Sequence, residues 1–505
     1  MNIKNRVLLF FVLLKFIIHY FLIAPGYDLH RDEYLHLDQA RHLAWGYESV
    51  PPFTSWISYI ILQLGNSVSL IKFFPVLFGA LTTVVVWKTI ELLKGSIFAL
   101  TLGATAITLS VLLRINILYQ PNSFDILCWS TFYYTIAQYI SHKKNKWLYY
   151  ASIVFAIGFL NKYNIIFLIA GIFPALLITS YRNWFFNRHV YGAMVLALII
   201  ISPNLLWQYN HDFPVIHHMK ELSETQLVNV NPSDFFKEQL LFFLGSIYVL
   251  IAAFISFFTY EPFKKYRLFF WTYIFTIILF TYLKAKGYYA IGLYPVFLAF
   301  GAVYLEHILQ RKPLYYIRPV LILITIGLFI PFLLIAFPIH SPSVTAERSP
   351  LYKKMGLNRW EDGKEHAMPQ DFADMLGWSE LAGKVDSAFI SVPQKELTIV
   401  ICDNYGQAGA INFYSKQSIR SVSFNADYIN WFNFSKRYEN VIAVRTADSD
   451  TGFVKERPMF ESIIFAGRIE DSLAREKGTS IYILKGAKIS INDILKQEIQ
   501  KRKRE

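Results

Sequence analysis

Residues 318–338 read RPVLILITIGLFIPFLLIAFP and carry no charged side chain after Arg318. An apolar helix of about 20 residues spans the hydrocarbon layer of a bilayer, so this stretch predicts a transmembrane helix. Beyond it the sequence is charged and mixed up to Glu505, with glycine and proline punctuation and no further stretch of this kind. We therefore expect a membrane domain at residues 1–339 and a separate domain at residues 340–505.

Similar apolar stretches recur from the N-terminus up to this point. The whole chain of 505 residues is 54% hydrophobic and 17% charged, which is unlike a soluble protein of this length. We expect an α-helical polytopic membrane protein with about 11 to 13 transmembrane helices. The first stretch, Val7–Ile23, lacks a small-x-small cleavage site, which favours an uncleaved helix over a signal peptide. The predicted spans are 7–24, 70–93, 97–113, 123–140, 147–160, 164–181, 190–206, 240–259, 268–283, 288–305 and 318–338.

The net charge of +13 is explained by the membrane rather than by a nucleic-acid partner, which we do not expect. With the N-terminus inside, every cytoplasmic connection carries lysine or arginine, as the positive-inside rule requires. The opposite connections include residues 25–69, the turn at Gln120, the loop 207–239 and the turn 284–287. This topology also places the C-terminal domain on the extracytoplasmic side.

The C-terminal domain has the pattern of an α/β fold. Three runs, ELTIVICDNY (396–405), NVIAVRTA (440–447) and TSIYILKG (479–486), predict strands. Between the first two, QAGAINFYS (407–415) predicts the start of a helix. The two cysteines, Cys128 and Cys402, indicate neither a disulfide framework nor a metal site.

The first outer loop, residues 25–69, contains GYDLHRDEYLHLDQARHLAWGYESVPP from Gly26 to Pro52. Apolar residues recur from Tyr34 to Tyr47 at spacings of three and four, which predicts a helix on the membrane surface. Asp32 then lies near the helix start, where the helix dipole favours an ionised carboxylate. Such a group can accept a proton from an acceptor hydroxyl or amine that attacks the anomeric carbon of a sugar. The alternative is that Asp32 only caps the helix.

Other charged residues lie at outer-facing turns. Asp125 follows the turn YQPNSF, and a boundary carboxylate indicates either a functional residue or an N-cap. Lys162, Lys284 and Lys286 can neutralise the phosphate of a lipid carrier or can extend to lipid headgroups.

The loop WQYNHDFPVIHH, residues 207–218, is rich in aromatic residues and histidine. Its rings can stack on a sugar or form an interfacial belt. A divalent metal held by Asp32 and His36, with His211, His217 or His218, is a further option, although the spacing matches no established ligand pattern.

Seven short strings extend over the whole chain in a family-like order. Together they resemble the GT-C superfamily of integral membrane glycosyltransferases. More closely, the chain resembles the bacterial branch related to protein O-mannosyltransferases and to the aminoarabinose transferase that modifies lipid A. The strings are HRDE (30–33), GYESVPP (46–52), QPNSFD (120–125), GFLNKY (158–163), SPNLLWQYNHDFP (202–214), KAKGYYAIGLYP (284–295) and DNYGQAGAINFY (403–414).

The resemblance implies an inverting transfer of a mannose-like hexose or a pentose from a polyprenyl-phosphate donor at the outer face of the bacterial cytoplasmic membrane. The acceptor is then a glycan, a lipid such as lipid A, or a protein. The resemblance makes Asp32 the catalytic carboxylate with Glu33 beside it, and it leaves a divalent metal as an open option. Lys162 and Lys286, with Lys284, are then the donor-phosphate contacts, and the acceptor or sugar pocket comprises Asp125, Gln120, His211 and Tyr288.

Two other classes of function share some of these features. Many spans with embedded aspartate and lysine also describe a membrane transporter. A flippase for lipid-linked glycans needs a similar lipid groove. The charges gather at outer loops rather than at mid-membrane, and no inverted repeat of the spans is evident, which favours the glycosyltransferase.

Overall fold

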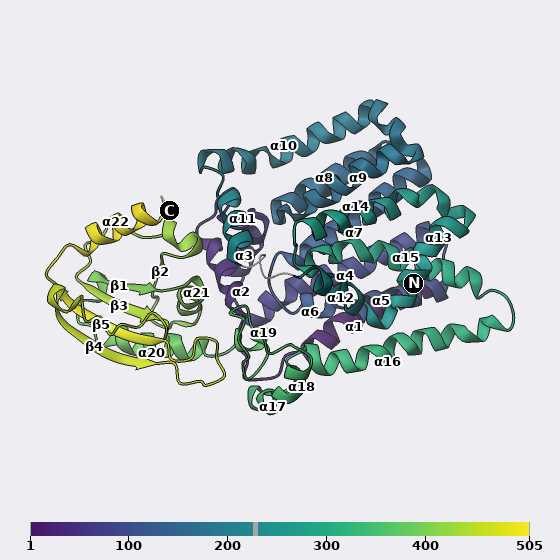
Figure 1. The fold of residues 1–505 in the computed structure, drawn as a ribbon. Helices are drawn as coiled ribbons and strands as arrows, with labels where there is room; N and C mark the ends of the chain where they lie inside the picture. Colours follow the sequence, from purple (N-terminus) through teal and green to yellow (C-terminus); the bar gives the residue numbers. More distant parts are fainter. Residues whose placement is uncertain (1, 226–230, 504–505) are drawn as a thin grey trace. The chain divides into compact units, whose positions relative to one another are not determined.

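The computed structural model describes residues 2–225 and 231–503, and in it each apolar stretch that the sequence assigns to the membrane is mostly helical, although some of the stretches, such as 97–113 and 240–259, are broken. These helices run roughly side by side (Figure 1). The polytopic helical fold is therefore confirmed. The helices are α1 (Ile3–Tyr20), α4 (Val68–Leu92), α5 (Ile97–Thr108), α7 (Asn122–His142), α8 (Lys146–Asn161), α9 (Ile166–Ile178), α10 (Arg188–Asn210), α13 (Ile247–Thr259), α14 (Arg267–Tyr282), α15 (Tyr294–Ile308) and α16 (Arg318–Ala336).

The helices differ in length and shape. Within the described residues, four are long and apolar enough to cross a membrane alone, and up to six do so if each of two bent pairs counts as one span. The bends are 110° between Tyr163–Ile178 and Ser180–Phe186, and 61° between Pro232–Leu241 and Leu244–Thr259. The remaining apolar stretches form helices that are either shorter, such as α5 with 12 residues, or less apolar, such as α7 with 21 residues.

The chain groups into two units, which we describe separately. The helical unit comprises Met1–Leu22, Ala44–Thr54 and Ser69–Phe337, and the α/β unit comprises Ile23–Leu43, Ser55–Val68 and Pro338–Glu505. The sequence placed the whole loop 25–69 with the membrane domain. The structure instead groups two parts of that loop with the C-terminal residues, because side chains of Ile23–Leu43 form hydrogen bonds with them.

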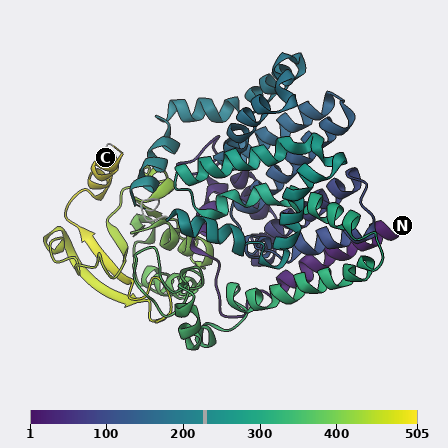
Figure 2. The ribbon, with the colours of Figure 1, turned by 45° about the vertical axis from the view of Figure 1, so that its right-hand side comes forward.

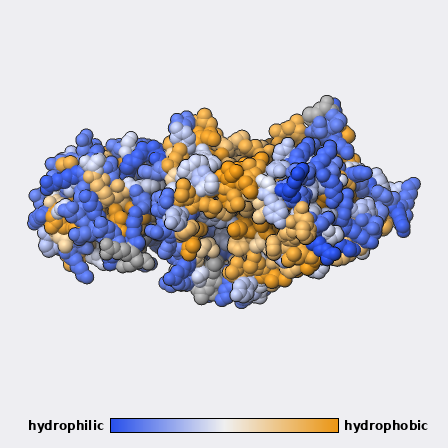
Figure 3. All heavy atoms as spheres, turned by 90° about the horizontal axis from the view of Figure 1, so that it is seen from above, coloured by the Kyte–Doolittle hydropathy of each residue, from blue (hydrophilic) through white to orange (hydrophobic). Residues whose placement is uncertain are grey.

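The helical unit has an interior helix and a peripheral one. In the helical segment Gly287–Ile308, which includes α15, 78% of the apolar window is buried, whereas in Leu314–Ala336, which includes α16, the figure is 11%, so most side chains of α16 lie on the outside of the unit. Close packing of α15 requires Gly301, because a Cβ there would lie 1.9 Å from the Val249 carbonyl oxygen of α13. On the face seen in Figure 3, hydrophobic residues form a broad band with hydrophilic residues to both sides, as expected for a protein embedded in a bilayer.

The α/β unit contains a five-stranded sheet in the order β2-β1-β3-β5-β4. Strands β2, β1 and β3 are parallel, and β5 is antiparallel to both β3 and β4. The predicted strands are β1, β3 and β5, which confirms the α/β fold. A second view shows the same sheet from another side (Figure 2). The strands are β1 (Thr398–Cys402), β2 (Ser421–Ser423), β3 (Asn440–Arg445), β4 (Phe460–Arg468) and β5 (Ser480–Ala487).

Helices pack around this sheet and on the N-terminal part of the unit. Helices α20 (Trp378–Ile390) and α21 (Tyr405–Tyr414) contact the strands and each other. Helix α22 (Ile491–Arg502) buries Ile491 and Leu495 in a core that includes Ile399 of β1. Helix α2 (Arg31–Asp38), continued by η1 (Gln39–Arg41), packs on α21.

Shorter helices fill the remaining connections of both units. They are α3 (Phe53–Gln63), α6 (Leu112–Ile115), α11 (Pro214–Thr225), α12 (Pro232–Leu241), α17 (Pro342–Glu347), α18 (Ser349–Lys354) and α19 (Gln370–Ala373).

Candidate functional site

Helix α2 begins earlier than the sequence pattern indicates, and Asp32 does not cap it. His30 is the N-cap residue, and its backbone N–H donates to Glu33 Oε2 at 2.7 Å in a capping box. Glu33 is fully buried in this arrangement. The capping interpretation therefore applies to His30 and Glu33, and the Glu33 carboxylate has a structural task at the helix start.

Asp32 lies in the first turn of α2 with a side chain that is 38% exposed. Its Oδ1 accepts a hydrogen bond from Tyr405 Oη at 2.6 Å, and its Oδ2 lies 3.8 Å from His30 Nδ1. Burial opposes ionisation, but electrostatic interactions with the His30 ring and the Arg31 guanidinium, together with the Tyr405 hydrogen bond, outweigh it and lower the pKa of Asp32. The Asp32 carboxylate is thus an ionised acceptor at neutral pH.

Further polar contacts hold the segment around α2 within the α/β unit. Asp28 Oδ2 accepts from the backbone N–H of Trp378 at 2.9 Å. At the other end of the helix, Asp38 Oδ2 accepts from Tyr428 Oη at 2.7 Å. Because these contacts flank Asp32 on both sides, its position is fixed by the fold of this unit.

The structure brings only two of the proposed metal ligands into one short helix. His36 lies one turn after Asp32 and is buried, and burial lowers the pKa of its imidazole, which is therefore neutral at neutral pH. Its Nδ1 lies 3.5 Å from Gln39 Oε1. In the part of the chain that the structure describes, no three His, Cys, Asp or Glu side chains are grouped so that they can hold a metal ion.

A second polar cluster lies at the start of α7 in the helical unit. The Asp125 carboxylate accepts from Trp129 Nε1 at 3.0 Å and from Asn164 Nδ2 at 3.0 Å. No side-chain cap hydrogen bond is present at this helix start, where Pro121 is the N-cap residue. Asp125 is therefore a buried acceptor held by neutral donors and not a helix cap.

Lys162 belongs to the same cluster. Its Nζ donates to Asn122 Oδ1 at 2.7 Å and lies 4.5 Å and 5.1 Å from the ring centroids of Tyr289 and Tyr288. Asn122 Nδ2 in turn donates to Gln120 Oε1 at 3.0 Å. Of the predicted residues, Gln120, Asp125, Lys162 and Tyr288 are therefore brought together here.

The remaining predicted residues of the helical unit differ in exposure. Lys286 is half-buried and directly precedes the short helix η7 (Gly287–Leu293) that carries Tyr288. Lys284 is exposed. His211 is also exposed, and its ring stacks on Trp207 of the preceding turn at 4.2 Å between centroids.

Sequence reasoning missed the neutral partners of these charges. Tyr405, Asn122 and Asn164 each contact a predicted site residue. Tyr405 lies in the string DNYGQAGAINFY and Asn122 in QPNSFD, so both strings contained the signal. Nothing in the local pattern paired them with their distant partners.

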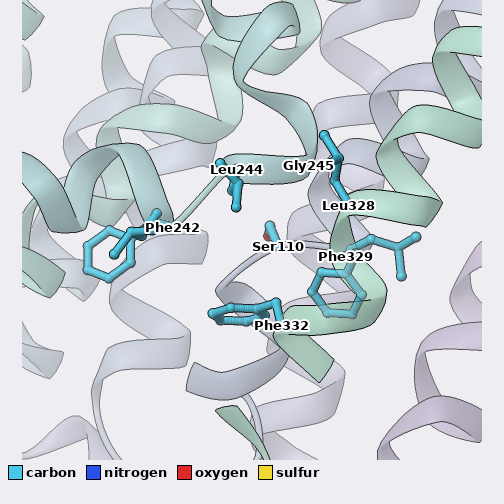
Figure 4. Close-up of a pocket in the computed structure, with 9 residues that line it drawn as sticks. Ser110, Phe242, Leu244, Gly245, Leu328, Phe329 and Phe332 are labelled. Atoms are coloured by element: carbon cyan, nitrogen blue, oxygen red, sulfur yellow. The ribbon is translucent and has the colours of Figure 1, made fainter. Parts of the chain in front are cut away.

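The helical unit also contains an apolar pocket at the bend between α12 and α13 (Figure 4). Its lining has no charged side chain, so the pocket supplies neither a general acid nor a general base. None of the predicted site residues lines it. The lining residues are Leu109, Ser110, Leu241, Phe242, Leu244, Gly245, Leu328, Phe329 and Phe332.

Comparisons with known proteins agree with this architecture. The sequence profile of the family described as dolichyl-phosphate-mannose-protein mannosyltransferase matches residues 49–207. The lipid A galacturonosyltransferase RgtD of Rhizobium johnstonii is 23% identical over 228 residues. That match covers 42% of this chain and 47% of the relative, so this chain matches about half of the relative's length.

Two solved structures share the fold. ArnT from Cupriavidus metallidurans bound to undecaprenyl phosphate has a TM-score of 0.61 at 12% identity, over 95% of this chain and 98% of that chain. The oligosaccharyltransferase of Archaeoglobus fulgidus, in complex with zinc and sulfate, has a TM-score of 0.51 at 10% identity, over 87% and 68%. The resemblance that the sequence strings indicated is therefore confirmed, and this multi-pass membrane protein has the GT-C fold of ArnT-like integral membrane glycosyltransferases.

Proposed function

We propose that this protein transfers a sugar from a polyprenyl-phosphate donor to an acceptor, with inversion at the anomeric carbon and with Asp32 as the general base. One observation carries the proposal: an ionised, partly exposed carboxylate is fixed at the start of a helix by Tyr405. A base must be ionised, accessible and oriented, and Asp32 meets each requirement.

The proposed reaction is a single displacement. The acceptor hydroxyl or amine attacks the anomeric carbon while its proton passes to an Asp32 carboxylate oxygen. The bond from that carbon to the phosphate oxygen breaks, and its electron pair leaves with the polyprenyl phosphate. One displacement inverts the anomeric centre, so a single base suffices.

Lys162 is the proposed contact for the departing phosphate. Its ammonium donates to Asn122 and lies beside two tyrosine rings, which orient the charge. Cationic groups stabilise the charge that develops on a phosphate leaving group. Lys286 lies two residues before Tyr288 and is the proposed second contact, whereas Lys284 is exposed and is assigned a smaller part.

The relatives guide the choice of donor and acceptor. A relative named as a lipid A galacturonosyltransferase supports a uronic acid as the sugar and lipid A as the acceptor. The ArnT structure contains undecaprenyl phosphate, which supports a polyprenyl carrier. We propose this combination in place of a mannose-like sugar.

Transfer in detergent tests the proposal. The full-length protein is incubated with lipid A and with polyprenyl-phosphate galacturonate, mannose or aminoarabinose, and the products are identified by mass spectrometry. We expect Asp32→Asn to lower kcat by roughly 10²- to 10⁴-fold, the range for loss of a general base. Asp38→Asn, a change in the same helix, is the matched control and should keep most of the activity. Wild-type transfer rates in Asp32→Asn would refute the assignment.

The proposed location is the outer face of the bacterial cytoplasmic membrane. Labelling of intact cells with a membrane-impermeant thiol reagent tests it, because both native cysteines are buried. The exposed residue Lys416 of the α/β unit, changed to cysteine, should react before lysis. The exposed residue Lys144, changed to cysteine, should react only after lysis. The reverse pattern would invert the topology.

A further inference from the structure

We propose that Tyr405 is a positioning residue that holds the Asp32 carboxylate in its working orientation, so that the α/β fold is part of the catalytic machinery. This inference rests on the proposed role of Asp32. The two residues are separated by 373 positions in the sequence, yet Tyr405 Oη lies 2.6 Å from Asp32 Oδ1. Such a short distance is typical of a hydrogen bond from a hydroxyl to a charged carboxylate.

Tyr405 lies at the carboxyl end of the parallel strands of the sheet. It is the first residue of α21, which follows β1 at the carboxyl end of the three parallel strands. The chain leaves β1 toward β2 on one side, while β3 lies on the other side of β1. In open α/β sheets, ligands bind outside the carboxyl ends of strands where the connections diverge in this way. In this protein the side chain that meets Tyr405 there is Asp32.

The backbone around Tyr405 is rigidly held. Asn404 caps α21 through a hydrogen bond from the Gln407 N–H at 3.0 Å. Asn404 and Gln407 both donate to the buried carboxylate of Glu476, at 3.1 and 2.7 Å. On the other side, Arg445 of β3 binds Asp403 at 2.6 Å. The phenol of Tyr405 therefore approaches Asp32 from a fixed base.

The hydroxyl of Tyr405 is suited to donate and not to lose its proton. Burial and the adjacent Asp32 carboxylate raise the pKa of this phenol. The guanidinium of Arg31 lies 4.7 Å from the ring centroid and restrains the ring from its face. The torsion angle χ2 of an aspartate side chain has a broad distribution, so the carboxylate can rotate about its last bond. One fixed donor on Oδ1 therefore restricts the range of orientations that the carboxylate adopts.

A purely structural contact is the competing explanation, and the molecule contains a matched control for it. Tyr428 donates to Asp38 at the end of the same helix at 2.7 Å. Both bonds join a tyrosine of the C-terminal region to an aspartate of α2. They differ in that the Asp38 residue is buried, with 7% exposure, whereas the Asp32 side chain is 38% exposed. Asp38 Oδ2 also accepts from Asn412 Nδ2 at 2.6 Å. A purely structural role predicts that the loss of either tyrosine bond affects folding stability and does not selectively lower kcat.

Kinetics of Tyr405→Phe and Tyr428→Phe separate the two explanations. With polyprenyl-phosphate galacturonate and lipid A, we expect Tyr405→Phe to lower kcat about 10- to 100-fold, because small misplacements of a catalytic group are costly. Its KM for the donor should stay within about twofold of the wild-type value, since no donor contact is lost. Tyr428→Phe should keep kcat within about threefold. In an Asp32→Asn background, Tyr405→Phe should cause no further loss.

A second measurement needs no substrate. The full-length protein in detergent is treated with a water-soluble carbodiimide, and modification of Asp32 is quantified by peptide mass spectrometry. A carboxylate released from its hydrogen bond reacts faster, so Tyr405→Phe should raise Asp32 labelling several-fold and Tyr428→Phe should not.

The outcomes separate this inference from the proposed function. Unchanged Asp32 labelling in Tyr405→Phe, or equal kcat values for the two tyrosine variants, would overturn the positioning role. Increased labelling of Asp32 in Tyr405→Phe, together with full activity of Asp32→Asn, would support the Tyr405–Asp32 hydrogen bond and would refute Asp32 as the base.

Discussion

The two units each contain an aspartate that the sequence marked as functional, and the two carboxylates are placed differently. Asp125 of the helical unit is buried, and its two oxygens accept from Trp129 and Asn164. Asp32 of the α/β unit is partly exposed, and the Arg31 guanidinium adds positive charge beside it. A carboxylate occupied by neutral donors in a closed site is poorly placed to take a proton from a substrate. The comparison therefore supports the proposal that Asp32, and not Asp125, is the base.

The largest effect that sharpens this comparison is expected at Lys162, a lysine of the polar cluster around Asp125 in the helical unit. Lys162→Met removes the charge but keeps most of the side-chain volume. We expect kcat/KM for the polyprenyl-phosphate donor to fall about 100-fold, a typical effect of removing one group that stabilises charge in a transition state. Steady-state transfer kinetics measure the change.

Lys284→Met is the control for this experiment, because Lys284 is an exposed lysine of the helical unit. It should change kcat/KM by no more than about threefold. Equal losses for both variants would mean that overall positive charge, and not the Lys162 contact, is what the donor requires.

A smaller effect is expected at Asp125, and it concerns the stability of the fold rather than the rate of transfer. Asp125→Asn places an amide opposite the two N–H donors, and one of them loses its acceptor. We expect the free energy of unfolding to fall by about 1 to 3 kcal/mol. Thermal unfolding in detergent measures it, and kcat should fall far less than in Asp32→Asn. The opposite ranking of the two kcat values would reverse the assignment of the base.

Asn164→Ala provides the partner measurement. It removes the donor to Asp125 Oδ2 and a second bond to the Tyr289 carbonyl oxygen at 3.1 Å. Because the two residues share one hydrogen bond, the double variant Asp125→Asn/Asn164→Ala should be less destabilised than the sum of the two single variants. If the two losses in the free energy of unfolding are strictly additive, the hydrogen bond between Asp125 and Asn164 does not contribute to stability.

The comparison also shows which features of the fold and of the candidate site could be predicted from the sequence and which could not. Charged residues beside apolar stretches stand out, so the sequence singled out Asp125 and Lys162, whereas it singled out Asp32 through the first outer loop and the string HRDE. The start of α2 was misplaced because a histidine N-cap with Glu33 is an uncommon form of the capping box. Membership of α2 in the α/β unit was missed for another reason. Tyr405 and Tyr428 lie more than 370 residues away from the carboxylates that they bind, and no local periodicity records such a pairing.

The smallest effect is expected in the pH dependence of transfer. Among the titratable groups that interact with Asp32 are His30, Arg31 and His36 of its own segment, Tyr405 of α21, and the carboxylate of Asp374. Burial favours the protonated acid, but His30, Arg31 and the Tyr405 hydrogen bond together hold the pKa of Asp32 below its ordinary value. A base with a lowered pKa stays ionised as the pH falls, so kcat/KM should not decline through loss of this base until the pH is below about 4.

Arg31→Met tests this argument, because loss of a nearby positive charge favours the protonated carboxyl. The pKa of Asp32 should then rise, and the acid limb of the kcat/KM profile should move to higher pH by less than about one unit. Arg31→Lys keeps the charge and should leave the limb in place, although it alters the stacking on Tyr405. A shift of the same size in both variants would assign the effect to the stacking geometry. A limb that moves to lower pH in Arg31→Met would exclude Asp32 as the group whose ionisation limits transfer.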